Sequence, residues 1–406
     1  MIYDMSFQYY TLPQNTSGAV NIPIFNTPTP LAILTVAAGS GNDIATVRAN
    51  IGWQAMNEPT QVIFKIWRGA PVTGQLVCSV QDSAESSFDD LATTDFSGVV
   101  SGLVTNQPVT FVLTAETVST GTQARVIGPL TMTIFDTNSN IVSYYQFPNN
   151  IFGTANIPVT QTPVPVAFIV VNVEPGQNVI LRHTACWIAT GSLTPKVDML
   201  FKIWRGAPIT GTLIASADDS ADVERGAVTS FSHVDSGFTS AQTITYVITA
   251  EAPDPGHTAS IVGALTITGS TQALSSFFTL PQNTFGSVNI PITASATPLA
   301  AITVQTSPDL ELALRAAVGW QLPPGRITPV LFKIWRGAPN TGNLIYSALD
   351  SAEGNYDFRK VTALAHVDRG FTTSGLVTYT LTAELTSSGT AASVIGPLTF
   401  TAVPEN

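Results

Sequence analysis

The residues best suited to bind a metal ion lie in three copies of a short acidic motif. Each copy reads Asp-Ser-Ala and then a second acid, giving the pairs Asp82 and Glu85, Asp219 and Asp222, and Asp350 and Glu353. Carboxylate oxygens suit Ca²⁺, which takes about six to eight oxygen ligands. One motif supplies only two carboxylates, so these acids are weak metal candidates. The alternative is a turn that ends a strand, in which the aspartate bonds its own backbone.

A second set combines charges with tryptophan and also recurs in every copy. Its members are Arg48, Lys65, Trp67 and Glu116; Arg182, Lys202, Trp204 and Glu251; and Arg315, Lys333, Trp335 and Glu384. One interpretation is a carbohydrate site, with tryptophan stacked on a sugar and charged groups bonding hydroxyls. The other is an inter-domain seam, in which tryptophan buries area and the charge pairs fix the register. We favour the seam, because residues repeated on a half-buried sheet face usually pack.

The histidines argue against catalysis. His233 and His366 each stand two residues before an aspartate, whereas we align Thr93 with them in the first copy. Gly-x-Ser-x-Gly, His-Glu-x-x-His and phosphate-loop motifs are missing from the sequence. We therefore expect histidines on loops or strand surfaces, no catalytic residues, no cofactor and no enzymatic activity.

These residues belong to a threefold internal repeat. The octapeptide Phe-Lys-Ile-Trp-Arg-Gly-Ala-Pro occurs at 64–71, 201–208 and 332–339. Trp53, Trp187 and Trp320 recur at intervals of 134 and 133 residues, which is the length of a whole domain. The sequence therefore predicts three tandem domains, over 1–137 (with an N-terminal arm at 1–10), 138–272 and 273–406.

Each unit reads as a series of short strands. Residues 46–54 alternate, so that Val47, Ala49, Ile51 and Trp53 share one face. Helical periodicity is nearly absent, and glycine, proline and asparagine punctuate the runs. Seven to nine such strands per unit predict an all-β fold of antiparallel jelly-roll β-sandwiches. Because Trp53, Trp187 and Trp320 lie on the apolar face, we expect them in the cores.

Composition excludes several function classes. Charged residues make up 11% of the chain and the net charge is −11, without a basic run, which argues against nucleic-acid binding. No apolar run approaches the roughly 20 residues that span a bilayer, and no export signal is visible. We therefore expect no membrane insertion. Cys78 and Cys186 occupy non-equivalent positions and are predicted to be buried free thiols.

The order of these features resembles the C1q/tumour-necrosis-factor-like jelly roll, especially the bacterial versions on endospore surfaces. The resemblance rests on the split first strand over 21–36, the central tryptophan-bearing strand and the closing Gly-Pro-Leu-Thr at 396–399. Such domains usually trimerise, so the resemblance implies that three tandem copies can form a single-chain pseudo-trimer.

The leading functional hypothesis is a structural, self-assembling surface protein, a spore exosporium or appendage fibre subunit. Its partners would be copies of itself or other surface-layer proteins, and the family resemblance implies assembly without a signal peptide. The arm 1–10 is predicted to dock beside an edge strand of another molecule. One alternative is a virion component, a phage tail-fibre or capsid-decoration protein. Another is a lectin-like adhesin that binds carbohydrate through the tryptophan and acid sets.

Overall fold

The fold is all-β, as the sequence predicts. The computed structural model describes residues 7–37, 43–57, 59–85, 90–104, 107–136, 141–191, 196–271, 274–387 and 391–405. Within these ranges every regular element is a strand, 27 in all. The same ranges contain no helix that is long and apolar enough to cross a membrane.

Nine strands recur in each repeat, so that β1 corresponds to β10 and β19, and β9 to β18 and β27. The first repeat contains β1 (Phe7–Thr11), β2 (Ile22–Ile24), β3 (Thr29–Ala37), β4 (Asp43–Asn57), β5 (Pro59–Arg68), β6 (Gln75–Glu85), β7 (Leu91–Leu103), β8 (Pro108–Thr117) and β9 (Gln123–Asp136). The second contains β10 (Ile141–Gln146), β11 (Ile157–Val159), β12 (Val164–Val173), β13 (Val179–Gly191), β14 (Lys196–Arg205), β15 (Thr212–Asp222), β16 (Gly226–Asp235), β17 (Gln242–Glu251) and β18 (Thr258–Ser270).

The third repeat contains β19 (Ser276–Thr279), β20 (Ile290–Ile292), β21 (Thr297–Thr306), β22 (Glu311–Gln321), β23 (Ile327–Arg336), β24 (Asn343–Glu353), β25 (Arg359–Asp368), β26 (Gly375–Leu385) and β27 (Ala392–Glu405). Strand β9 ends at Asp136 and β18 at Ser270, close to the predicted domain boundaries. The boundaries themselves, 137/138 and 272/273, lie outside the described residues.

Two antiparallel sheets form each repeat. In the first repeat the inner sheet has the order β1-β9-β4-β7, with β2 also paired to β9, and the outer sheet has the order β3-β8-β5-β6. The second and third repeats have the same two sheets with the corresponding strands. This is a jelly-roll sandwich, three times over, and it confirms the predicted fold class.

The period-two alternation of the strands builds one core per repeat. In the first repeat Trp53 on β4 contacts Phe64 on β5 across the sandwich, with ring centroids 6.1 Å apart. Trp53, Trp187 and Trp320 are each 0% exposed, which confirms their predicted core position. Cys78 and Cys186 are buried and unbridged, as predicted.

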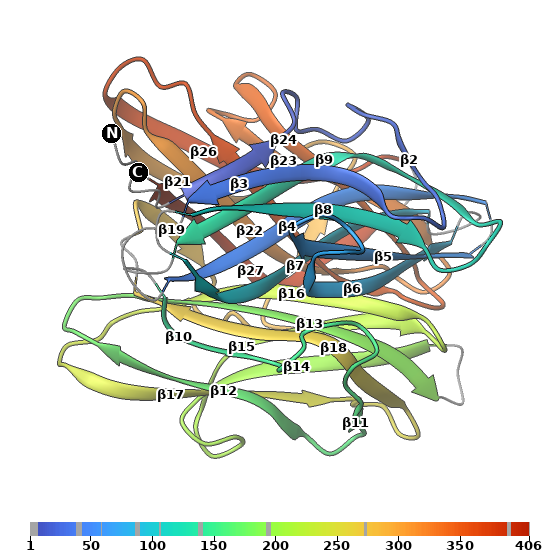
Figure 1. The fold of residues 1–406 in the computed structure, drawn as a ribbon. Helices are drawn as coiled ribbons and strands as arrows, with labels where there is room; N and C mark the ends of the chain where they lie inside the picture. The colour runs from blue at the N-terminus through green and yellow to red at the C-terminus, as the bar shows by residue number, and fades with distance from the viewer. Residues whose placement is uncertain are drawn as a thin grey trace.

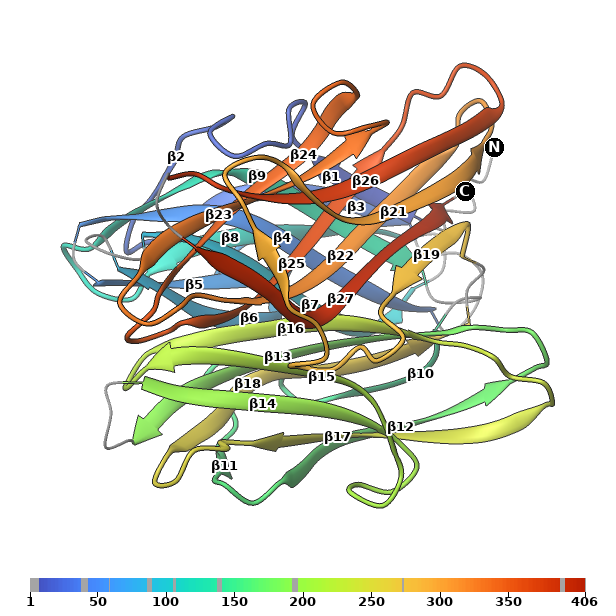
Figure 2. The same cartoon turned by 180° about the vertical axis from the view of Figure 1, so that it is seen from behind.

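The three repeats close into a ring around a pseudo-threefold axis. The main-chain oxygen of Asn15, Asn150 or Asn283 accepts the amide of a serine in the neighbouring outer sheet: Ser347 at 3.2 Å, Ser79 at 3.2 Å and Ser216 at 3.1 Å, respectively. Repeat 1 therefore contacts repeat 3 as well as repeat 2. Figures 1 and 2 show this arrangement from opposite sides, with the green-to-yellow second repeat below the other two.

The inner sheets face the axis. Strands β7, β16 and β25 contact one another there, and β6, β15 and β24 each lie against the next repeat. The outer sheets therefore have one edge covered by a neighbour, and that edge cannot recruit another chain. Residues 7–10 are not a docking arm, since they belong to β1, which pairs with β9 from Phe7 opposite Phe135 to Thr11 opposite Thr131. Residues 1–6 of the predicted arm lie outside the described residues.

Candidate functional site

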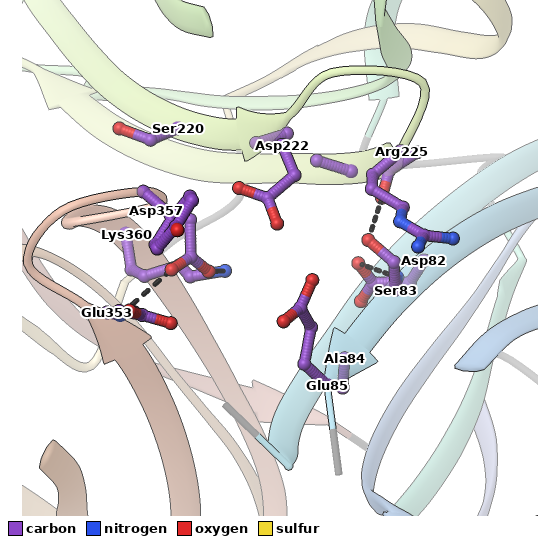
Figure 3. A pocket seen from close by; sticks show the side chains of 14 residues that line it. Asp82, Ser83, Ala84, Glu85, Ser220, Asp222, Arg225, Glu353, Asp357 and Lys360 are labelled. Carbon is purple, nitrogen blue, oxygen red and sulfur yellow. Dashed lines mark hydrogen bonds and ion pairs between the residues drawn. The ribbon is translucent and has the colours of Figure 1, made fainter. Parts of the chain in front are cut away.

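The three acidic motifs come together where the repeats meet. They form the last four residues of β6, β15 and β24. Glu85, Asp222 and Glu353 line a small space of about 30 Å³ together with Asp357 and Lys360. Figure 3 shows the carboxylates of Glu85 and Asp222 facing each other from different repeats. We call the six motif acids, Asp357 and Lys360 the acidic cluster.

The first acid of each motif is bound by a threonine of its own repeat. Thr94 donates its hydroxyl to Asp82, Thr229 to Asp219 at 2.7 Å and Thr362 to Asp350 at 2.5 Å. These threonines also accept the indole N–H of the core tryptophans at 2.8–2.9 Å. A Trp-Thr-Asp chain therefore links each core to the acidic cluster, because one hydroxyl can donate and accept at once.

The backbone and the motif serine complete the local structure. Asp82 and Asp219 also accept the amide of the following serine, at 3.0 and 3.2 Å, which is the self-bonding alternative expected for a strand end. The serine side chains bond across the seams. Ser83 donates to the Gly226 oxygen and Ser351 to the Leu91 oxygen, both at 2.7 Å, and Ser220 accepts from the Arg359 amide at 3.3 Å.

Burial controls the charge of the cluster. It raises the pKa of Asp219 and of Asp350 to about 7 each, against the attraction of Lys360. Burial also raises the pKa of Asp222, and a hydrogen bond and like charge from Glu85 and the charge of Asp357 raise it further. The cluster can therefore take up and release protons near neutral pH.

The lysine of the cluster comes from repeat 3, and Arg225 of repeat 2 also lines the space. Lys360 pairs with Asp357 and lies at the position held by Ala92 and Ala227 in the other repeats. Arg359 next to it pairs with Asp218 at 2.7 Å and Asp198 at 3.1 Å, both in repeat 2. Among the described residues no group of three or more His, Cys, Asp or Glu side chains could hold a metal ion. We assign the acidic cluster to contacts between repeats.

The predicted seam residues divide into two groups. Arg48, Arg182 and Arg315 lie on the inner sheets and act on one another across the axis. The other nine instead join two strands of their own outer sheet. Lys65 donates to Glu116, and the Trp67 indole donates to Thr114 at 3.0 Å.

The second and third repeats contain the same contacts, Lys202 to Glu251, Trp204 to Thr249, Lys333 to Glu384 and Trp335 to Thr382. The seam prediction is therefore corrected for Lys65, Trp67, Glu116, Lys202, Trp204, Glu251, Lys333, Trp335 and Glu384. Alternation along a strand identifies a face that points away from the core, but it does not distinguish a neighbouring domain from solvent.

The histidines are buried, contrary to the expectation of surface positions. Strand register also changes the alignment of the copies: His233 and His366 correspond to Gly98, not to Thr93. His366 lies in a groove of about 600 Å³ between repeats 3 and 1, and His233 lies in the corresponding groove of about 530 Å³ between repeats 2 and 3. Between repeats 1 and 2, the Gln146 amide instead bonds the backbone of Val99.

Sequence reasoning identified the repeated Leu/Phe-Pro-x-Asn leader without assigning it a function. In repeats 1 and 3 its asparagine side chain also bonds the middle of the closing strand of its own repeat, since Asn15 Oδ1 accepts from the Leu130 amide at 2.8 Å and Asn283 Oδ1 from Leu398 at 2.7 Å. The signal for this role was present, because the asparagine recurs at the same place in each copy of the repeat.

Comparison with known proteins identifies no family. No protein-family model matches the chain, and no curated protein has a matching sequence. Among solved structures, an archaeal virus turret protein with a triple jelly roll covers 97% of this chain and 90% of its own, at 9% identity and a TM-score of 0.18. A tandem carbohydrate-binding module of Paenibacillus barcinonensis Xyn10C covers 58% and 82%, at 10% identity and a TM-score of 0.20. An infectious bursal disease virus structure covers 98% and 79%, at 10% identity and 0.20. Likenesses this weak carry no functional argument.

Proposed function

We propose that the protein is a non-enzymatic structural subunit that assembles with copies of itself into a surface layer or fibre. The observation that carries the proposal is the closed ring, in which the same leader-to-strand hydrogen bonds form all three seams. The acids and arginines that the repeats share act between or within repeats. Such engagement of the shared charged residues within the particle is what we expect of a scaffold.

The free edges of the outer sheets offer a surface for assembly. Strands β3, β12 and β21 stand at the ends of the sheet orders, opposite the edges that the neighbouring repeats cover. Ile33 on β3 and Phe168 on β12 are each 59% exposed. An exposed apolar edge strand pairs readily with another chain. We propose that copies of the protein associate along these edges.

The setting that fits the proposal best is a bacterial spore surface, where an exosporium or appendage subunit has this role. A phage tail-fibre or capsid-decoration protein would use the same architecture, and the neighbouring genes distinguish the two settings. A lectin that stacks sugars on the repeated tryptophans has less support, because Trp67 and Trp335 are buried and their indole N–H groups already donate to threonines.

Electron microscopy and sedimentation velocity of the purified full chain test the proposal. We expect fibres or sheets built from compact three-lobed particles. Phe168→Lys combined with Ile33→Lys should strongly reduce these assemblies and leave the particles folded, because a lysine on an edge strand opposes pairing. Val118→Lys adds a positive charge at an exposed loop residue and should leave assembly intact. Single particles at all protein concentrations would contradict the proposal.

A further inference from the structure

The inner sheets bring three arginines to the pseudo-threefold axis, and we call them the arginine triad. Arg48, Arg182 and Arg315 occupy equivalent positions on β4, β13 and β22, each paired in register with a threonine of the closing strand. The charges of Arg48 and Arg182 both act on Arg315, and strands β7, β16 and β25, which pair with β4, β13 and β22, contact one another at the axis. Three like charges at a buried junction need compensation.

In repeat 1 a carboxylate on the neighbouring strand β7 supplies an ion pair. Arg48 makes a bidentate ion pair with Asp95, with Nε to Oδ1 at 2.9 Å and Nη2 to Oδ2 at 2.7 Å. The positions equivalent to Asp95 are Ser230 in repeat 2 and Ala363 in repeat 3. Neither side chain can neutralise an arginine.

The other two arginines keep buried donors without a hydrogen-bond partner. The Nη2 atoms of Arg182 and Arg315 are both inaccessible to solvent and unpaired. Arg315 is 5% exposed and stacks on Phe135 of repeat 1, with 4.3 Å between the guanidinium carbon and the ring centroid. An unpaired buried N–H is costly and uncommon in folded proteins.

Loss of a proton does not relieve this site at neutral pH. Burial lowers the pKa of Arg182 to about 10, and burial together with the charges of Arg182 and Arg48 lowers the pKa of Arg315. Both remain charged at neutral pH, because a guanidinium does not lose its proton in that range. Among the described residues, Asp95 and Glu405 are the carboxylates that act on both Arg182 and Arg315, which sets two carboxylates against three guanidinium groups.

We propose that the arginine triad binds a small monovalent inorganic anion of the chloride class on the pseudo-threefold axis, held by the Nη2 groups of Arg182 and Arg315. One such anion balances the excess positive charge of the site and accepts a hydrogen bond from each of the two N–H groups. A water molecule would accept the same hydrogen bonds but would leave the charge uncompensated. The site would connect repeats 2 and 3 at the axis and stabilise the closed ring.

Thermal unfolding of the full-length protein in sodium chloride, bromide or gluconate at constant ionic strength tests the site. We expect Tm to rise with chloride and bromide along a saturable curve, since an anion that binds only the folded state stabilises it by mass action. Gluconate is too large for the site and should give no such curve. Equal, unsaturable trends in all three salts would overturn the proposal.

Two variants and one control locate the effect. Ser230→Asp gives Arg182 the partner that Asp95 gives Arg48, so the saturable response to chloride should disappear while Tm in gluconate rises. Arg315→Met should also abolish the response. Arg125→Met removes an arginine that bonds Gln54 away from the axis and should retain it. Retention of the response in Ser230→Asp would count against the site.

A crystal grown in bromide gives a readout independent of stability. We expect an anomalous peak within hydrogen-bond distance of Arg182 Nη2 and Arg315 Nη2 in the parent protein and none in Ser230→Asp. Density without an anomalous signal would show water instead of an anion and would overturn the proposal. A monomeric protein that binds bromide would refute self-assembly but not this site, so the two proposals fail separately.

Discussion

The acidic cluster and the arginine triad both bring like charges from three repeats to one axis, but they differ in how the charge can be relieved. A carboxyl group can stay protonated, and burial raises the pKa of Asp219 and Asp350 to about 7. A guanidinium group stays charged, so the arginine triad needs a negative partner, and Asp95 supplies one to Arg48 alone. The acidic cluster therefore responds to pH, whereas the arginine triad should respond to anions.

Among variants near the acidic cluster, Arg359→Leu should have the largest effect on stability. Arg359 pairs across the seam with Asp198 and Asp218, which are buried, while the equivalent residue in repeat 1 is Leu91. Without Arg359 the buried carboxylate of Asp218 loses its ion pair, while Asp198 keeps its pair with Lys196 at 3.2 Å. We expect a loss of about 3–5 kcal/mol in the free energy of unfolding at pH 8. Chemical denaturation measures it.

The double variant Arg359→Leu with Asp218→Leu is the matched control. It reproduces the seam between repeats 3 and 1, where Leu91 and Leu349 occupy these positions. Most of the lost stability should return. If the single variant were as stable as the parent, the ion pairs would contribute nothing to the seam.

Lys360→Ala tests the lysine of the acidic cluster. Repeats 1 and 2 already carry alanine there, so the change is sterically tolerated, but it removes the positive charge that opposes the raised pKa of Asp219 and Asp350. We expect a loss of about 2–3 kcal/mol at pH 8 and a smaller one at pH 5, where protonated carboxyls need less compensation. An equal loss at both pH values would show that the lysine acts through packing.

Asp350→Asn isolates the pH response of one acid. The parent must ionise a buried carboxyl whose pKa is raised to about 7, and this cost grows as pH rises from about 4 through 7. The variant should therefore gain about 1–2 kcal/mol relative to the parent between pH 5 and pH 8. The buried histidines, whose pKa values burial lowers, act alike in both proteins and cancel. A flat difference would contradict the raised pKa.

Lys65→Met should have the smallest effect. Its ion pair with Glu116 joins two strands of one outer sheet and is partly exposed to solvent. Such pairs contribute about 0.2–1 kcal/mol. The variant should remain a closed ring with unchanged responses to pH and chloride. A large loss of stability would instead support the sequence-based prediction that Lys65 lies in a seam between repeats.

The sequence alone predicted the fold class, the triplication and the core tryptophans, because these depend on repeated residue types and on period-two alternation along the strands. It did not predict which charged residues meet. Asp95 and Asp235 are the same residue type but occupy different positions in their repeats. Aligning them therefore assigned the wrong residue of repeat 1 to His233 and His366. The threonine that binds Asp82 lies twelve residues later, at Thr94, on an edge strand of the other sheet, and only the packing of the two sheets brings the two together.

The acids of the motif show the same limit. The sequence shows carboxylates that are suitable ligands for a metal ion. It does not show the hydrogen bonds that those carboxylate oxygens already accept. The seam itself depends on main-chain contacts of the leader asparagines, and a backbone bond leaves no residue-type signature beyond the repeat.

Ring closure is the claim on which the rest depends, and cross-linking tests it directly. The Ser17 amide donates to the Ser347 main-chain oxygen at 3.0 Å, although the two residues are 330 positions apart. With both replaced by cysteine, a short thiol cross-linker at low protein concentration should give a monomeric product of altered electrophoretic mobility, absent from either single variant. Only intermolecular products, or none, would show that the three repeats form an open string.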